Sequence, residues 1–248
     1  MAETEILLSR GRYRARVAAG AADVAAAQAL RTLCFRTGST DGDSYDSLCS
    51  HVLVEENASG ALVCCFRLLL LESGAELMRS YSAQYYELAA LQAFAGRMAE
   101  LGRFCIHPDW QDADILRVAW GAMTDLVDGQ GVQMLFGCSS FAGTSAAPYA
   151  EALALLRQRH LAPAKWRPGI KAPEVVRFGA EPLREAETKK ALQKMPPLLR
   201  TYLLMGGWVS DHAVVDRQMN TLHVFTGLET AAIPAERKRL LRAVAGGF

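Results

Sequence analysis

The spacing of apolar residues along the chain follows two periods, and each period predicts one kind of element. Apolar residues at every third or fourth position predict an amphipathic helix, whereas short apolar runs between turn residues predict buried strands. The first half of the chain is expected to contain a strand at 12–17, a helix at 22–35, a strand hairpin at 51–56 and 61–72, a helix at 80–95 and a strand at 98–107. The second half is expected to contain a helix at 114–127, a strand at 132–141, helices at 147–161 and 196–207, and a strand pair at 208–216 and 221–228.

This order of elements predicts an α/β fold with a mixed, mostly antiparallel central sheet flanked by helices. We expect a single domain over residues 1–248, because no internal repeat or long low-complexity linker is present. Within it, a helical and basic stretch at about residues 145–195 interrupts the pattern before the last helix and hairpin. We interpret that stretch as an insertion.

Composition places the chain among packed globular proteins, since 51% of its 248 residues are hydrophobic and 21% are charged. A net charge of +1 gives no global signature of nucleic-acid binding. The six cysteines form no CxxC pair and are expected to be reduced, which favours the cytoplasm, and no metal site is expected. The N-terminus lacks a secretory pattern, and the most apolar window is interrupted by Arg67, so a soluble protein with peripheral contact at the inner membrane face left open is expected.

The stretch AELGRFCIHPDW at 99–110 carries Glu100 and Arg103 inside an otherwise apolar strand. Charged side chains are rarely taken into a core unless they are paired or used. In a regular strand the two would face opposite sides, but Gly102 between them can mark a bulge that exposes backbone N–H groups to a ligand. The alternative is that Glu100 and Arg103 form structural ion pairs.

Two residues are candidates for a general base. Burial in an apolar strand disfavours the charged form of a carboxylate, which suits Glu100 to accepting a proton, directly or through water. His51 forms a second candidate cluster with Asp43 and Asp46, and it is the alternative base. A histidine at the start of a strand can equally be structural.

Seven stretches, in order along the chain, resemble the L-ornithine N-alpha-acyltransferases of bacterial ornithine-lipid synthesis, a family within the GNAT superfamily that is related to acyl-homoserine-lactone synthases. They are LRTLCFR (30–36), DSYDSLCSHVLV (43–54), FRLLL (66–70), YSAQYYEL (81–88), ELGRFCIHPDW (100–110), LFGCSSFAGT (135–144) and PPLLRTYLLMGGWVSDHAVVD (196–216). The resemblance implies transfer of a 3-hydroxy fatty acyl group from acyl carrier protein to the α-amino group of L-ornithine, giving lyso-ornithine lipid.

The resemblance also implies which part of the chain meets the acyl donor. The superfamily binds a pantetheine arm on a splayed strand, which here implies Gly102, Phe104 and Cys105 for the phosphopantetheine of acyl carrier protein, with no cofactor held by the enzyme itself. Ser139, in the small-residue stretch 138–140, is expected to let the acyl arm pass. A covalent acyl-enzyme on Cys138 is disfavoured because the sequence pairs it with no base.

An ornithine acceptor needs an arginine for its carboxylate and a carboxylate for its side-chain ammonium. Arg31, Arg67 and Arg103 are candidates for the first role. Asp46 and Asp216 are candidates for the second.

The start of the helix expected at 114–127 disfavours a CoA donor. A Gly-rich loop would cradle a diphosphate there, but the sequence DWQDADILRVAW has no glycine and carries Asp109, Asp112 and Asp114, which repel one. An acidic carrier protein, or anionic lipid headgroups, would instead suit the basic residues of the later chain. These are Arg157, Arg159, Lys165, Arg167, Lys171, Arg177, Arg184, Lys189, Lys190, Lys194 and Arg200.

Other readings stay open at this point. In the last hairpin the chain has Ser210-Asp211-His212 and Leu222-His223-Val224, where the family tends to have Gly-Asp-Gly and Thr-Asp-Val, and this bears on the acceptor. The alternatives are an acyl-homoserine-lactone synthase that takes S-adenosylmethionine, and a non-catalytic module that binds carrier protein or membrane. The H-x4-D spacing of His107 and Asp112 is a weak match to glycerol-phosphate acyltransferases.

Overall fold

The computed structural model describes residues 6–35, 38–179 and 186–245. The chain forms two compact units: the first comprises 1–70, 101–132 and 235–248, and the second comprises 71–100 and 133–234. The expected mixed α/β fold with mostly antiparallel pairing is confirmed. The chain passes from the second unit into the first within strand β6 (Met98–Ile106), the strand that carries Glu100 and Arg103.

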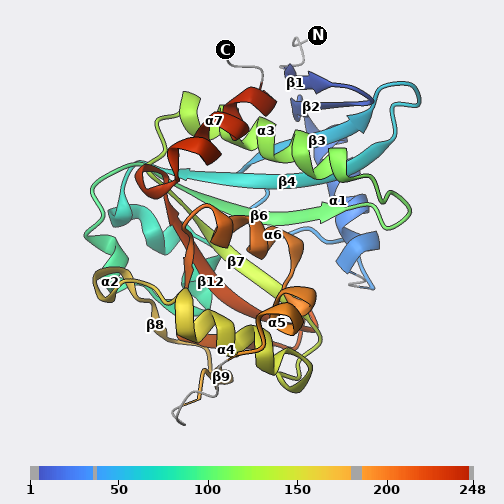
Figure 1. The fold of residues 1–248 in the computed structure, drawn as a ribbon. Helices are drawn as coiled ribbons and strands as arrows, with labels where there is room; N and C mark the ends of the chain where they lie inside the picture. Colours follow the sequence, from blue (N-terminus) through green and yellow to red (C-terminus); the bar gives the residue numbers. More distant parts are fainter. Residues whose placement is uncertain (1–5, 36–37, 180–185, 246–248) are drawn as a thin grey trace. The chain divides into compact units, whose positions relative to one another are not determined.

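The first unit is a sheet with helices on it. Strands β1 (Ile6–Arg10), β2 (Tyr13–Val17), β3 (Ser50–Glu56) and β4 (Leu62–Leu71) pair antiparallel in sequence order, and β6 follows β4. Helix α3 (Ala113–Gly129) contacts β1, β2 and α7 (Ala235–Ala245). Figure 1 shows α3 and α7 on one face of these strands and α1 (Ala21–Phe35) on the other.

Local sequence explains the main boundaries of this unit. The β3–β4 turn is closed by Glu56, whose carboxylate accepts hydrogen bonds from the backbone N–H and hydroxyl of Ser59, and by Gly60 at φ +71°. A residue with a side chain rarely adopts that φ. Asp112 caps α3 by accepting from the N–H of Asp114 at 2.9 Å, as the acidic start of that helix predicts.

The second unit contains the rest of the expected strands. Antiparallel pairs join β7 (Met134–Ala142) to β12 (Thr221–Glu229), β12 to β11 (His212–Asp216), β11 to β9 (Val175–Arg177), β12 to β10 (Trp208–Val209) and β5 (Tyr86–Glu87) to β8 (Gly169–Ile170). Its helices are α2 (Ala89–Gln92), α4 (Ala150–Arg159), α5 (Thr188–Lys194) and α6 (Pro197–Leu204). Short 3-10 turns are η1 (Gly74–Arg79), η2 (Ser82–Gln84), η3 (Ala147–Tyr149), η4 (Ala164–Trp166) and η5 (Thr230–Ala232).

Helices α4, α5 and α6 share one apolar core with the sheet of this unit. Leu153 and Leu156 of α4 and Leu199 of α6 pack in one cluster with Phe141 of β7 and Val224 of β12. The described residues of the stretch at 145–195, interpreted from the sequence as an insertion, lie in the second unit. Across the described residues, no helix combines the length and apolar character that a membrane span needs.

The prediction of one helix at 80–95 is wrong. That stretch forms η2, β5 and α2. The apolar spacing is helical, but the backbone here bonds to distant partners and so forms no continuous helix. The N–H groups of Tyr81 and Ser82 donate to the Glu100 carboxylate, and Tyr86 pairs with Ile170 of β8. The sequence pattern also did not predict β1, β8, β9, α5 or α7.

A charge network fixes the start of α1 to the strands beneath it. The Arg16 guanidinium of β2 donates to both carboxylate oxygens of Asp23 at 2.6 and 2.8 Å and to Glu55 of β3. This contact lowers the pKa of Asp23 to about 2. Because the folded state thereby holds fewer protons, the contribution of Asp23 to stability is present above its ordinary pKa and is lost as the pH falls toward 2.

We therefore expect Asp23→Asn to lower the free energy of unfolding by about 1–2 kcal/mol at pH 7, with the deficit shrinking below pH 4. Urea unfolding at several pH values measures it. The control is Asp114→Asn, which loses an exposed pair with Arg117 and is expected to cost about 0.5 kcal/mol or less. A deficit that does not change between pH 7 and pH 3 would contradict the assigned ion pair.

Candidate active site

Glu100 is buried in the second unit, and its carboxylate accepts hydrogen bonds from Tyr81 and Ser82. The backbone N–H of Tyr81 donates to one oxygen at 2.8 Å, while the N–H and hydroxyl of Ser82 donate to the other at 2.7 and 2.5 Å. These donors stabilise the ionised form, which a proton acceptor must have. They also make Glu100 the carboxylate that fixes the start of η2, so it has a structural role whatever its chemistry.

A second buried carboxylate, Asp216, lies at the end of β11. Its side chain accepts from the backbone N–H of Met219 at 2.9 Å and from the Tyr85 hydroxyl at 3.3 Å. Tyr85 is in turn 3.2 Å, oxygen to oxygen, from Tyr81. Among the described residues, no Lys or Arg side chain forms a salt bridge with Asp216. The segment from Tyr81 to Tyr86 thus contacts both of these buried carboxylates.

His212 and His223, the two histidines that depart from the family pattern, both contact Tyr86. The Tyr86 hydroxyl lies 3.0 Å from Nδ1 of His223, and its ring centroid lies 5.4 Å from that of His212. Burial lowers the pKa of His223 to about 4, against the opposing effect of the Asp216 carboxylate, so the ring is neutral at neutral pH. Nε2 of each histidine is buried with no hydrogen-bond partner among the described residues.

Ser139 lies on β7 beside this group. Its hydroxyl accepts from Thr226 of β12 at 2.9 Å, and the side chain is buried. The adjacent Cys138 sulfur is 3.5 Å from the Ser82 hydroxyl. That Cys138 forms no covalent acyl-enzyme stays a prediction.

The first unit holds a cluster of three arginines and three aspartates. Arg31 of α1 pairs with Asp41 and Asp46, Arg67 of β4 with Asp43 and Asp46, and Arg103 of β6 with Asp41 and Asp43. The loop 41–46 thereby joins three elements. The structural ion pair expected as the alternative for Arg103 is present, with these aspartates and not with Glu100 as its recorded partners.

The pairs differ in how tightly they are made. Asp46 accepts from Arg31 at 2.7 Å and from Arg67 at 2.5 Å. Desolvation opposes its ionisation, but the hydrogen bonds from Arg31 and Gln28 prevail and hold the pKa of Asp46 well below its usual range. The contacts of Arg103, at 3.1 and 3.2 Å, are longer. Asp46 therefore already has two cationic partners, which Asp216 does not.

His51 belongs to the same cluster. It is buried on β3, opposite Arg67 in register, and its Nε2 lies 3.0 Å from the backbone carbonyl oxygen of Asp46. This contact is a structural one. A role for His51 as alternative base stays a prediction.

The donor-binding candidates lie on the second half of β6. Arg103 has φ +53°, so the strand departs from extended geometry at the residue after Gly102. A Cβ on Gly102 would lie 3.4 Å from Nε of Arg67, an ordinary contact distance. Phe104 stacks on Phe66 with centroids 5.7 Å apart, and Cys105 is buried. A non-glycine residue at positive φ is strained, and such strain is typical of functional sites.

The other sequence candidates take structural places. Asp112 accepts from the Tyr13 hydroxyl at 2.9 Å in addition to capping α3, which gives this residue a structural role. The basic residues at 157–200 are exposed, except for the half-buried Arg157; Arg184 lies outside the described residues. Tyr85, Ser82 and Asp41 were not singled out from the sequence, because their roles depend on partners far along the chain.

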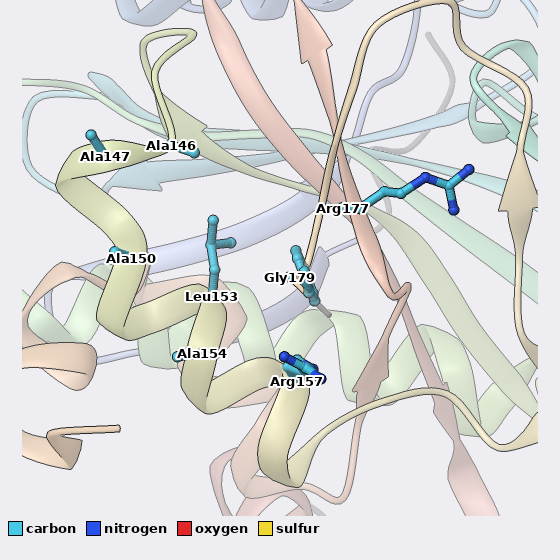
Figure 2. A pocket seen from close by; sticks show the side chains of 9 residues that line it. Ala146, Ala147, Ala150, Leu153, Ala154, Arg157, Arg177 and Gly179 are labelled. Carbon is cyan, nitrogen blue, oxygen red and sulfur yellow. The ribbon is translucent and has the colours of Figure 1, made fainter. Parts of the chain in front are cut away.

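A pocket of about 290 Å³ lies on the second unit between α4 and the segment after β9. Figure 2 shows Ala146, Ala147, Ala150, Leu153 and Ala154 along one side, with Arg177 and Gly179 on the segment opposite. Arg157 and Arg177 are the charged residues of its lining. The pocket is apolar with a cationic rim.

Comparison with known proteins gives a consistent result. Residues 27–121 match the model of the acetyltransferase (GNAT) domain family. A solved N-acyl amino acid synthase from uncultured soil microbes, FeeM, shares the fold with a TM-score of 0.52 at 10% identity, covering 89% of this chain and 92% of that one.

Curated sequences give a closer relation. An L-ornithine N(alpha)-acyltransferase of Rhodobacter capsulatus is 32% identical over 91% of this chain and 93% of its own length. One of Agrobacterium fabrum is 31% identical over 78% of this chain and 68% of its own length. One of Rhizobium meliloti is 30% identical over 94% of this chain and 85% of its own length. The chain therefore belongs to the L-ornithine N(alpha)-acyltransferase family and is an acyltransferase.

Proposed function

We propose that this enzyme transfers a 3-hydroxy fatty acyl group from acyl carrier protein to the α-amino group of L-ornithine, giving lyso-ornithine lipid. The observation that carries the acceptor half of this proposal is Asp216, a buried carboxylate without a cationic partner among the described residues. The relatives named L-ornithine N(alpha)-acyltransferase support the same acceptor.

Asp216 suits the side-chain ammonium of ornithine better than Asp46 does. A buried carboxylate without a cation is costly, and a bound ammonium would relieve that cost. His223 beside it, whose pKa burial lowers to about 4, supplies no positive charge at neutral pH. Asp46, by contrast, is already neutralised by Arg31 and Arg67. Arg31, Arg67 and Arg103 are likewise already paired with aspartates, and their expected role toward the acceptor's α-carboxylate stays a prediction.

Glu100 is the proposed base. Only a free amine attacks a thioester, so the α-ammonium must first give a proton to Glu100, directly or through water. The amine nitrogen then bonds to the thioester carbon and gives up its second proton, the C–S bond breaks, and that proton passes to the pantetheine sulfur, which leaves as a thiol. Because Ser82 and Tyr81 hold the carboxylate in one orientation, it stays positioned for this transfer.

The proposed donor is a carrier-bound thioester and not CoA. Asp112 and Asp114 place two carboxylates at the start of α3, where a diphosphate would otherwise bind, and Asp112 already uses the nearby N–H of Asp114. The exposed basic residues of the second unit suit an acidic carrier protein, and the pocket with Arg157 and Arg177 lies among them. Contact with the inner membrane face stays a prediction.

Replacement of the base tests the chemistry. We expect Glu100→Gln to reduce kcat by about 100-fold or more while KM for acyl carrier protein changes little, because proton transfer by a positioned side chain contributes about 10²–10⁴. Ser82→Ala is the matched control, since it removes one donor to Glu100 but keeps the carboxylate. Steady-state kinetics and thermal melting of both variants separate the two roles. An equal loss in Ser82→Ala at equal melting temperature would make Glu100 a structural residue.

Replacement of Asp216 tests the acceptor. We expect Asp216→Asn to lower kcat/KM for L-ornithine by about 10–100-fold, which corresponds to one charge-assisted contact. The kcat/KM for L-norvaline, which lacks the side-chain ammonium of ornithine, should not fall. Glu174→Gln, which neutralises an exposed carboxylate paired with Arg217 in the same unit, should change neither. Equal losses with ornithine and norvaline would remove Asp216 from this role.

Charge reversal tests the donor. We expect Arg177→Glu to raise KM for acyl carrier protein about 5–10-fold at low salt, with the difference shrinking as salt screens the contact. KM for ornithine should stay constant. The control is Arg239→Glu on the exposed side of α7. Insensitivity of Arg177→Glu at low salt would exclude this face as the docking surface.

A further inference from the structure

Three of the six cysteines lie together in the first unit, one on α1 and two on the strands that it packs against. The sulfur atoms of Cys65 on β4 and Cys105 on β6 are 3.6 Å apart. The Cys34 thiol of α1 donates to the backbone carbonyl of Ile106, the residue after Cys105, at 3.3 Å. Cys34 and Phe35 also pack on the small apolar cluster that contains Cys65 and Cys105. We call these residues, Cys34, Cys65 and Cys105, the thiol cluster.

The thiol cluster and the arginine–aspartate cluster share their three supporting elements. Helix α1 contributes Arg31 and Cys34, three residues apart and so on one helical face. Strand β4 contributes Cys65 and Arg67, two residues apart and so on one face of the strand.

Strand β6 completes the arrangement with Arg103 and Cys105. Each element thus carries one member of each cluster. A covalent bond within the thiol cluster would consequently fix elements that the ion pairs also hold.

The three thiols differ in access and in reactivity. Cys34 is half-buried, whereas Cys65 and Cys105 are buried. The neighbouring Cys105 thiol lowers the pKa of Cys34, and hydrogen bonds with Cys34 and Cys65 raise the pKa of Cys105. A more acidic, partly accessible thiol next to a protonated buried one is the pattern of an oxidant-sensitive cysteine with a resolving partner.

We propose that the thiol cluster is a peroxide-sensitive site that forms a disulfide between Cys34 and Cys105, linking α1 to β6. The Cys34 thiolate attacks one oxygen of hydrogen peroxide, the O–O bond breaks, and hydroxide leaves, so the sulfur becomes a sulfenic acid. The Cys105 sulfur then attacks the Cys34 sulfur, the S–O bond breaks, and the departing hydroxide takes the Cys105 proton. Two thiols are oxidised by two electrons and one peroxide is reduced to two waters.

Two observations separate this site from a metal centre and from the other cysteines. No group of three or more His, Cys, Asp or Glu side chains in the described parts of the chain is arranged to hold a metal ion. Cys64 neighbours Cys65 on β4 and so points to the opposite face of the strand. Cys49 and Cys138 are half-buried but lie outside the thiol cluster.

The test counts thiols in the full-length protein and needs no activity measurement. The reduced protein is treated with hydrogen peroxide, alkylated under denaturing conditions and digested without reduction for mass spectrometry. We expect the six free thiols to fall to four, a peptide pair linked through Cys34 and Cys105, and full recovery with dithiothreitol. Failure of the proposed acyl transfer would leave this result unaffected.

Three variants assign the residues. Cys34→Ser should form no disulfide, and Cys105→Ser should instead accumulate a Cys34 sulfenic acid that dimedone labels. Cys49→Ser is the matched control, because it removes another half-buried cysteine and should still lose two thiols. Six thiols after peroxide treatment, a link through any other pair, or loss of the disulfide in Cys49→Ser would overturn the proposal.

Discussion

The burial of charged side chains is the constraint around which both units of this protein are arranged. A charge removed from water must be paired or hydrogen-bonded, because its desolvation otherwise costs more than folding supplies. In the second unit the Glu100 carboxylate takes backbone N–H groups from Tyr81 and Ser82 and so prevents the segment that follows from forming a helix. In the first unit the loop 41–46 exists in its observed form because its aspartates neutralise three arginines from three different elements.

The same constraint distinguishes the two buried carboxylates of the second unit. Glu100 accepts hydrogen bonds from the neutral N–H and hydroxyl of Ser82, which fix its orientation. Asp216 has a tyrosine hydroxyl and one backbone N–H, with the neutral ring of His223 close by. In the proposed reaction one carboxylate accepts a proton and the other binds a cation. An acceptor with two amino groups, such as ornithine, would give its α-ammonium proton to the first carboxylate and place its side-chain ammonium at the second.

Sequence patterns predicted the elements whose stability is local. The β3–β4 hairpin, α1, α3 and the β11–β12 pair follow from apolar spacing, from Gly60 at a tight turn and from Asp112 at a helix start. The helix expected at 80–95 failed because the partners of that backbone lie at Glu100 and Ile170. For the same reason the sequence identified the charged residues of each cluster but not their pairing, and it did not identify Tyr85, which contacts Asp216 across 131 positions.

The central claim is that the two amino groups of one acceptor are treated differently, the α-amino group being acylated and the side-chain ammonium being bound as a cation. Its most direct test is incubation of the purified enzyme with 3-hydroxyacyl carrier protein and L-ornithine, followed by tandem mass spectrometry of the product. The account predicts a single mono-acylated ornithine with the amide on the α-nitrogen. An amide on the side-chain nitrogen, or untouched ornithine while S-adenosylmethionine yields an acyl-homoserine lactone, would contradict it.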